Sequence, residues 1–124
     1  MNMREQLDDL RQTVIETSEG SHCSAVFGTN NYAHVKFSAG TDIGEILEGL
    51  PNDHCQYPHW GYLLKGKLVV SCGDRSWEKV RTGDVFYWPP GHSVAYLEDS
   101  ELIEFSPGEE MQEVLEHIQN KLNS

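Results

Sequence analysis

Between residues 21 and 106 the sequence is a succession of short apolar runs separated by turn residues, and this feature most restricts the fold. The runs are rich in Val, Tyr, Phe and Trp, and they fall at 33–37, 60–64, 68–72, 76–80, 85–88, 94–97 and 102–105. Short strands with regular turn signals are typical of all-β sandwiches and barrels. Lys65-Gly66, which lies between two of the runs, predicts a tight hairpin that needs a residue with positive φ.

Both ends of the chain carry helical patterns instead. Apolar residues recur at helical spacing near the N-terminus, which predicts an amphipathic helix over residues 3–16. Near the other end, Ser106 is predicted as an N-cap, with Pro107 at the first helical position and Glu109 three residues after the cap. A helix over residues 107–122 is therefore predicted. The length of 124 residues predicts one domain, 1–124, with a β core at roughly 21–106.

Charge and cysteine content restrict the partners and the compartment. Twenty acidic residues against nine basic ones leave a net charge of −11, which disfavours nucleic-acid binding. The sequence has no apolar run of the roughly 18 residues needed to cross a membrane, and its polar N-terminus predicts no signal segment. The three cysteines form no CxxC pair, which predicts free thiols rather than a structural zinc knuckle. A cytoplasmic protein is expected.

The stretch DHCQYPHWG, residues 53–61, gathers several metal-ligand types just before an apolar run. If the stretch is extended, Cys55 and His59 point to one face and His54 to the other. Thiolate sulfur and imidazole nitrogen are good ligands for zinc, iron or copper. Two ligands do not make a site, and His92 in Trp88-Pro89-Pro90-Gly91-His92 is the candidate third donor.

These segments resemble the cupin superfamily over roughly residues 30–106. The second motif of that superfamily contains G-x5-P-x-G, which residues 83–91 match in full. The first motif ends in E-x6-G, and here His59 takes the place of the glutamate while Gly66 supplies the glycine. The resemblance implies a cupin, or jelly-roll, β-barrel with a short helix at each end.

The usual cupin metal site of three histidines and one glutamate is absent. Asp53 and Cys55 stand where the family has two histidines, and Val94 stands where it has the last one. His92 lies two residues earlier, on the same face of the expected strand. The chain also resembles small cupins that carry C-x3-H-W-G and W-P-P-G-H, a pattern that supports an altered site and indicates no activity.

The resemblance therefore implies a rearranged site in which Cys55, His59 and His92 hold a metal, with His54 or Asp53 as a fourth ligand. Each residue also has a structural interpretation. Cys55 could be a small buried hydrophobe, His59 a hydrogen-bonded core residue, and His92 a cap for the turn before it. His54 could be an exposed loop residue. The alternative to a metal site is then a cupin cavity lined by the same residues without metal.

Other titratable residues are predicted to lie outside the site. Glu104 could line the cavity, but a position on the solvent-facing side of its strand is favoured. His22 and His117 are expected at the surface. His34 is expected to face solvent or a subunit interface.

A thiolate with two imidazoles favours zinc first and iron second over magnesium or manganese, and three protein ligands leave a position open for catalysis. One expectation is a metal-dependent dioxygenase, isomerase or hydrolase for a small organic acid or aromatic metabolite, with Glu104 or Asp53 handling protons. The other is a non-catalytic module that senses or stores a small molecule or metal. A homodimer is predicted, because small cupins commonly pair through sheets and the terminal helices need apolar partners.

Overall fold

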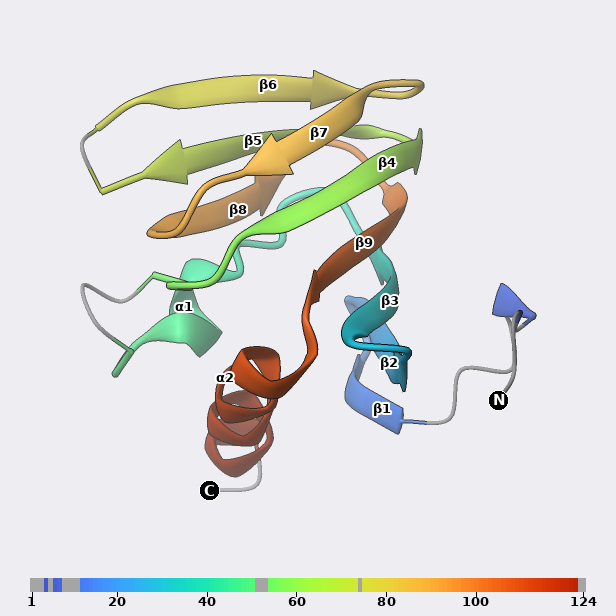
Figure 1. Ribbon diagram of the computed structural model, residues 1–124. Helices are drawn as coiled ribbons and strands as arrows, with labels where there is room; N and C mark the ends of the chain where they lie inside the picture. The colour runs from blue at the N-terminus through green and yellow to red at the C-terminus, as the bar shows by residue number, and fades with distance from the viewer. Residues whose placement is uncertain (1–3, 5, 8–11, 51–53, 74, 123–124) are drawn as a thin grey trace.

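The computed structural model describes residues 4, 6, 7, 12–50, 54–73 and 75–122. Within them, antiparallel strands form two sheets that face each other (Figure 1). The strands are β1 (Gln12–Thr17), β2 (Gly20–Phe27), β3 (Asn30–Phe37), β4 (His59–Lys65), β5 (Lys67–Cys72), β6 (Trp77–Arg81), β7 (Val85–Trp88), β8 (His92–Tyr96) and β9 (Ser100–Pro107). The larger sheet has the order β1-β2-β3-β9-β4-β7, and the smaller has the order β6-β5-β8.

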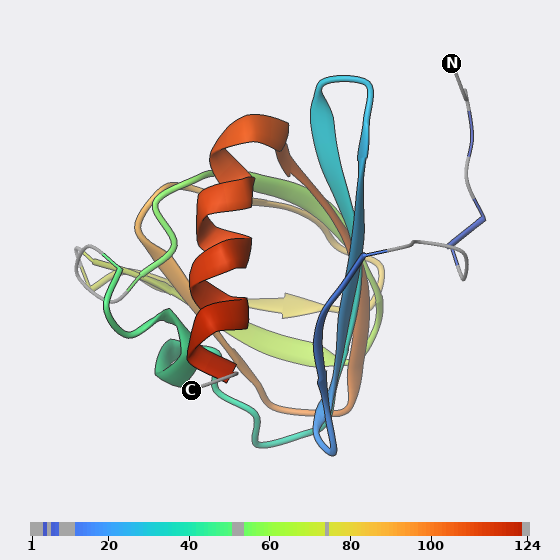
Figure 2. The same ribbon diagram turned by 90° about the horizontal axis from the view of Figure 1, so that it is seen from below.

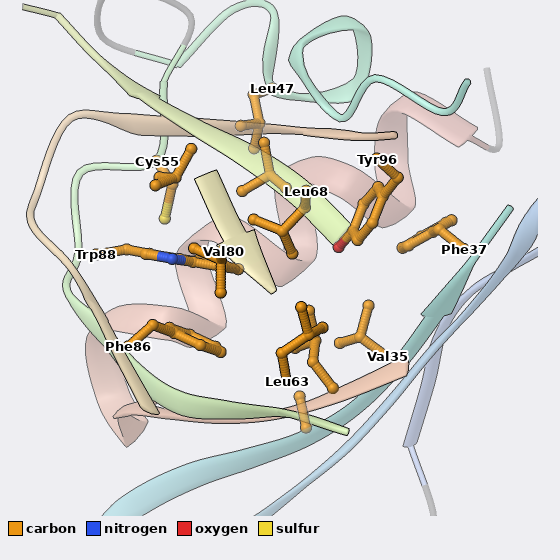
Figure 3. Packing of buried hydrophobic residues seen from close by; sticks show 14 of the residues in the cluster. Val35, Phe37, Leu47, Cys55, Leu63, Leu68, Val80, Phe86, Trp88 and Tyr96 are labelled. Carbon is orange, nitrogen blue, oxygen red and sulfur yellow. The ribbon is translucent and has the colours of Figure 1, made fainter. Parts of the chain in front are cut away.

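The prediction of an all-β, jelly-roll fold is confirmed, and each of the seven predicted runs matches one of the strands β3 to β9 to within one residue at the ends of the run that extend beyond it. Alternating side chains explain how two sheets enclose one core. In β9, for example, alternate residues from Ser100 to Ser106 are buried while those between them are partly exposed. Figure 3 shows core residues from both sheets pointing toward one another, among them Leu63 of β4 and Leu68 of β5.

The prediction of an N-terminal helix over residues 3–16 is wrong for its last part. Residues 12–17 form strand β1, which pairs antiparallel with β2 along Gln12↔Ser24 to Thr17↔Gly20. This segment reads QTVIET, and its β-branched residues favour an extended backbone. Hydrogen bonds to β2 stabilise the strand more than the weakly helical spacing of the apolar residues favours a helix. Most of the earlier part of the predicted helix lies outside the described residues.

The C-terminal helix is present as α2 (Gly108–Leu122), and a short helix α1 (Gly44–Leu47) was not predicted. Ser106 does not cap α2, because β9 continues through Pro107 and the Ser106 side chain is buried. Figure 2 shows α2 lying across one end of the space between the sheets, with α1 beside it. The His117 imidazole binds the Glu48 carbonyl oxygen at 2.9 Å, which joins α2 to the end of α1. Of the helices described, none is long and apolar enough to cross a membrane.

Close packing inside β4 predicts a large effect of adding one methyl group at Gly61. A Cβ there would overlap the Ile103 carbonyl oxygen and the Phe86 ring. We therefore expect Gly61→Ala to lower the free energy of unfolding by about 2 kcal/mol or more, as overpacked core substitutions do. Gly73→Ala is the matched control, because a Cβ at Gly73 would meet no atom within 4 Å. Urea denaturation of both variants checks this, and equal stabilities would contradict it.

Candidate metal centre

Backbone hydrogen bonds place Cys55 beside His92, although 36 residues of chain separate them. The Cys55 amide donates to the His92 carbonyl oxygen at 2.9 Å, and the His92 amide donates to the Cys55 carbonyl oxygen at 3.1 Å. Cys55 thus forms an antiparallel bridge with His92, the first residue of β8. On its other side, β8 pairs with β5. The segment before β4 therefore acts as a short extension of the smaller sheet, and the Cys55 sulfur points toward the core (Figure 3).

His59 reaches the same place from the larger sheet. It is the first residue of β4 and pairs with Trp88, the last residue of β7. The turn Pro89-Pro90-Gly91 then carries the chain from β7 to His92, where β8 begins in the smaller sheet. Gly91 has a φ of 86°, a value that glycine adopts without strain. The sharp turn predicted by the sequence thus brings the two histidines together from different sheets.

The three candidate ligands converge in the interior. One ligand atom from each of Cys55, His59 and His92 lies within 4.8 Å of the other two, and all three residues are buried. The Cys55 sulfur lies 3.6 Å from His59 Nε2, and the ring centroids of the two histidines are 4.6 Å apart. We call these three residues the Cys-His-His group.

Burial sets the protonation states of this group. It lowers the pKa of His59 to about 4 and that of His92 to about 3, so both imidazoles are neutral near pH 7. Burial also raises the pKa of the Cys55 thiol to about 11. Two neutral imidazoles have lone pairs for a metal, while the thiol binds as a thiolate and must release its proton.

The hydrogen bonding of His92 fits a metal ligand. Its Nδ1 donates to the Pro89 carbonyl oxygen at 2.7 Å, which leaves the Nε2 lone pair directed elsewhere. Ligating histidines usually donate their second ring nitrogen in this way, because the bond fixes the tautomer and the ring orientation. The donor chemistry and the convergence of the Cys-His-His group therefore fit a divalent metal ion.

The group forms part of the wall of a cavity of about 60 Å³. Both sheets and both helices contribute to the wall. Side chains of α2 close one side of it, namely Met111, Val114, Leu115 and Ile118. Apolar residues of the sheets and of the α1 region make up most of the rest, among them Val35, Phe37, Leu47 and Val94.

Two further titratable residues line this cavity, against the sequence-based expectation. His22 was expected at the surface and Glu104 on the solvent-facing side of β9, but they are only 7% and 6% exposed. Glu104 pairs with Ala33 of β3 and with Gly61 of β4, because β9 lies between these two strands in the larger sheet. The alternation of β9 does indicate an inward side chain for Glu104, because buried Leu102 has the same parity.

None of the other predicted site residues that the structure describes belongs to the set of close ligand atoms. His54 is partly buried and lies outside the group of close ligand atoms, so its role as a fourth ligand stays a prediction. Asp53 lies outside the described residues. His34 is buried and pairs with Glu101, rather than facing solvent. His117 is partly exposed and binds the Glu48 carbonyl oxygen.

Solved structures with a similar backbone identify the architecture. Oxalate decarboxylase from Bacillus subtilis, which has Mn(II) centres, matches with a TM-score of 0.64 and 18% identity over 86% of this chain. KdgF from Halomonas sp. matches with a TM-score of 0.59 and 24% identity, over 85% of this chain and 95% of its own. The chain has a cupin fold.

The likeness is one of fold. This chain spans only 29% of the length of the oxalate decarboxylase chain that it matches. No protein-family model matches its sequence, and the search of curated proteins gave no match. Its chemistry must therefore be argued from its own residues.

Proposed function

We propose that this cupin binds one divalent metal ion through Cys55, His59 and His92 and acts on a small organic acid in the adjoining cavity. The observation that carries the proposal is the convergence of three buried ligand atoms within 4.8 Å of one another at a cavity wall. Such a set leaves the metal a coordination position for a ligand or water, as in catalytic sites.

Zinc is the first choice of metal and iron the second. A thiolate donor and two imidazoles form a softer set than magnesium or manganese prefers. Bound in this site, the ion would polarise a carbonyl group or acidify a water molecule. The Mn(II) centres of oxalate decarboxylase are thus no guide to the metal of this chain.

The surroundings of the Cys-His-His group support an enzyme more than a sensor or storage module. Glu104 lines the same cavity, where burial raises the pKa of its carboxyl and allows it to hold a proton. The apolar side chains of α2 exclude bulk water from the cavity, which strengthens electrostatic interactions inside it. A dioxygenase, isomerase or hydrolase would use both features. The non-catalytic alternative needs neither a proton carrier nor an open coordination position.

Elemental analysis of the purified protein tests the metal and its identity. We expect close to one equivalent of zinc, or of iron when the cells are grown with iron in excess. Oxygen uptake by an iron-loaded sample on addition of a small organic acid would support a dioxygenase. A protein that holds no metal after purification, and takes up none on dialysis against zinc, would refute the proposal.

We also propose that the protein is cytoplasmic. Cys55, the proposed ligand, is a free thiol in the structure. A reducing compartment such as the cytosol would keep the Cys55 thiol available as a ligand, because disulfides rarely form there. Zinc bound to the Cys55 sulfur in cells would be consistent with that location.

We propose a homodimer formed through the outer face of the larger sheet. Two rows of cross-strand neighbours cover this face at β4 and β7. Trp60 pairs with Tyr87, and Tyr62 pairs with Val85. All four side chains are exposed, by 49%, 52%, 41% and 81% respectively. Phe105 and Ile103 of β9 extend the two rows on the other side of β4.

The size of this aromatic face supports a second copy as its partner. Three half-exposed aromatic side chains and one valine expose on the order of 300 to 400 Å² of apolar surface, the size of the largest patch on a typical monomer, and such patches are often functional. A stable interface buries ~800 Å² per partner, so this face would form the apolar centre of a larger contact. Light scattering at micromolar concentration is expected to give the mass of a dimer, and Tyr87→Lys to give a monomer. Trp77→Lys, on the smaller sheet, is the control expected to stay dimeric. A monomeric wild type would refute this proposal.

A further inference from the structure

The cavity has a polar side besides the Cys-His-His group. His22 of β2 and Glu104 of β9 both line it, and both are more than nine-tenths buried. His22 Nε2 has no hydrogen-bond partner among the described residues, and the same holds for Nε1 of Trp88, which also lines the cavity. Buried polar groups are nearly always hydrogen-bonded in folded proteins. These atoms therefore indicate something polar that occupies the cavity.

His22 and Glu104 interact electrostatically with the Cys-His-His group. A charge on Glu104 raises the pKa of Cys55, after the larger effect of burial. Burial lowers the pKa of His22 most, the charge of Glu104 raises it by less, and the charge of His59 lowers it by the least. Glu104 therefore lies within electrostatic range of Cys55, and His22 within range of His59, and all four residues line one cavity. A single small molecule can then contact the metal side and the polar side together.

The volume of the cavity limits the size of that molecule. About 60 Å³ holds roughly four to six water-sized groups. A two- or three-carbon acid with one further oxygen fits this space. A substituted aromatic ring does not, which separates the two substrate classes that the sequence left open.

Charge balance limits the choice further. A divalent ion and the Cys55 thiolate together carry one positive charge, because imidazoles bind a metal as neutral ligands. Burial raises the pKa of Glu104 and lowers that of His22, which favours the neutral form of both. A ligand with one negative charge then makes the buried site neutral, while a dianion leaves a buried charge unpaired. Unpaired buried charges are strongly unfavourable.

We propose that His22 and Glu104 are the recognition groups for a monoanionic two- or three-carbon acid, hydrogen-bonding its hydroxyl or keto oxygen while its carboxylate faces the Cys-His-His group. This inference rests on the proposed metal centre. In this proposal His22 and Glu104 bind the organic acid and do not coordinate the metal. It also distinguishes this cupin from a protein built for a dicarboxylate.

Calorimetric titration of the zinc-loaded protein with glycolate at pH 7 tests the proposal. We expect glycolate to bind, benzoate not to bind because of its size, and oxalate to bind more weakly because of its second charge. Glu104→Leu and His22→Leu should each weaken glycolate binding about tenfold, the effect of losing one buried hydrogen bond. Glu104→Gln keeps a neutral hydrogen-bonding group and should bind glycolate within about threefold of the wild type.

Zinc content and far-ultraviolet circular dichroism of each variant accompany the titrations. All variants should be folded and keep one equivalent of zinc. Loss of zinc from Glu104→Gln would assign Glu104 to the metal and overturn the inference. So would a folded Glu104→Leu that binds glycolate like the wild type, benzoate binding as tight as that of glycolate, or no binding of glycolate at all. A wild type without zinc would refute the metal centre itself, and this inference with it.

Discussion

Replacement of His59 by alanine is expected to remove most of the bound metal from the purified protein. His59 supplies one of three ligand atoms that lie within 4.8 Å of one another, and its ring is buried against His92. Loss of a residue that only supports a ligand commonly weakens metal binding by ~10- to 100-fold, so loss of a ligand itself should weaken it by more than about 100-fold. Elemental analysis after dialysis measures the effect.

His117→Ala is the matched control for His59→Ala. It removes the same kind of side chain, but the His117 ring binds the Glu48 carbonyl oxygen and is not among the close ligand atoms. We expect this variant to keep one equivalent of metal. His54→Ala measures the fourth-ligand prediction, and retention of metal is expected because His54 lies outside the Cys-His-His group. Equal metal content in His59→Ala and His117→Ala would contradict the assignment.

Acidification is expected to destabilise the metal-free protein well above the pH at which most carboxylates protonate. The unfolded chain protonates histidine near its ordinary pKa of about 6.5. In the folded protein, burial lowers the pKa of His59 to about 4 and that of His92 to about 3. Between these values the unfolded state binds more protons, so the free energy of unfolding falls as the pH falls. From pH 7 to pH 5 each imidazole should contribute a loss of about 2 kcal/mol.

Two other cavity residues modify this pH dependence. Burial also lowers the pKa of His22, which adds to the loss. It raises the pKa of Glu104, which opposes the loss, because the folded state then holds a proton that the unfolded state releases above its own pKa. Urea unfolding of the chelator-treated protein at pH 7 and pH 5 measures the net change. A His59→Gln, His92→Gln double variant should show a flatter pH dependence, and an unchanged slope would contradict the role of these imidazoles.

The strands could be predicted because their local signals agree with the final fold. Turn residues separate the runs, and Gly66 has the positive φ, 105°, that Lys65-Gly66 predicts. The pairing could not be predicted in the same way. Lys65-Gly66 joins β4 to β5, but these strands belong to different sheets and do not form a hairpin. A tight turn determines how the chain reverses locally, and packing of the two sheets decides which strands pair.

The metal-ligand residues could be chosen from the sequence because their chemistry and their spacing are local properties. Cys55 and His59 occur in one short segment, and His92 follows a turn that must bend sharply. The polar side of the cavity could not be found in this way. His22 lies in a strand that the sequence did not reveal, and the face of Glu104 depends on which side of β9 the second sheet covers.

By itself, the sequence determined the class of fold, the C-terminal helix and the residue types available to hold a metal. Each of these depends on periodicity, turn residues or side-chain chemistry within a few residues of chain. Only the tertiary structure decided that residues 12–17 pair as a strand and that Cys55 and His92 share a bridge. It also decided that His22 and Glu104 face the same cavity. These features depend on contacts between distant segments, whose free energy comes from packing two sheets and α2 around one core.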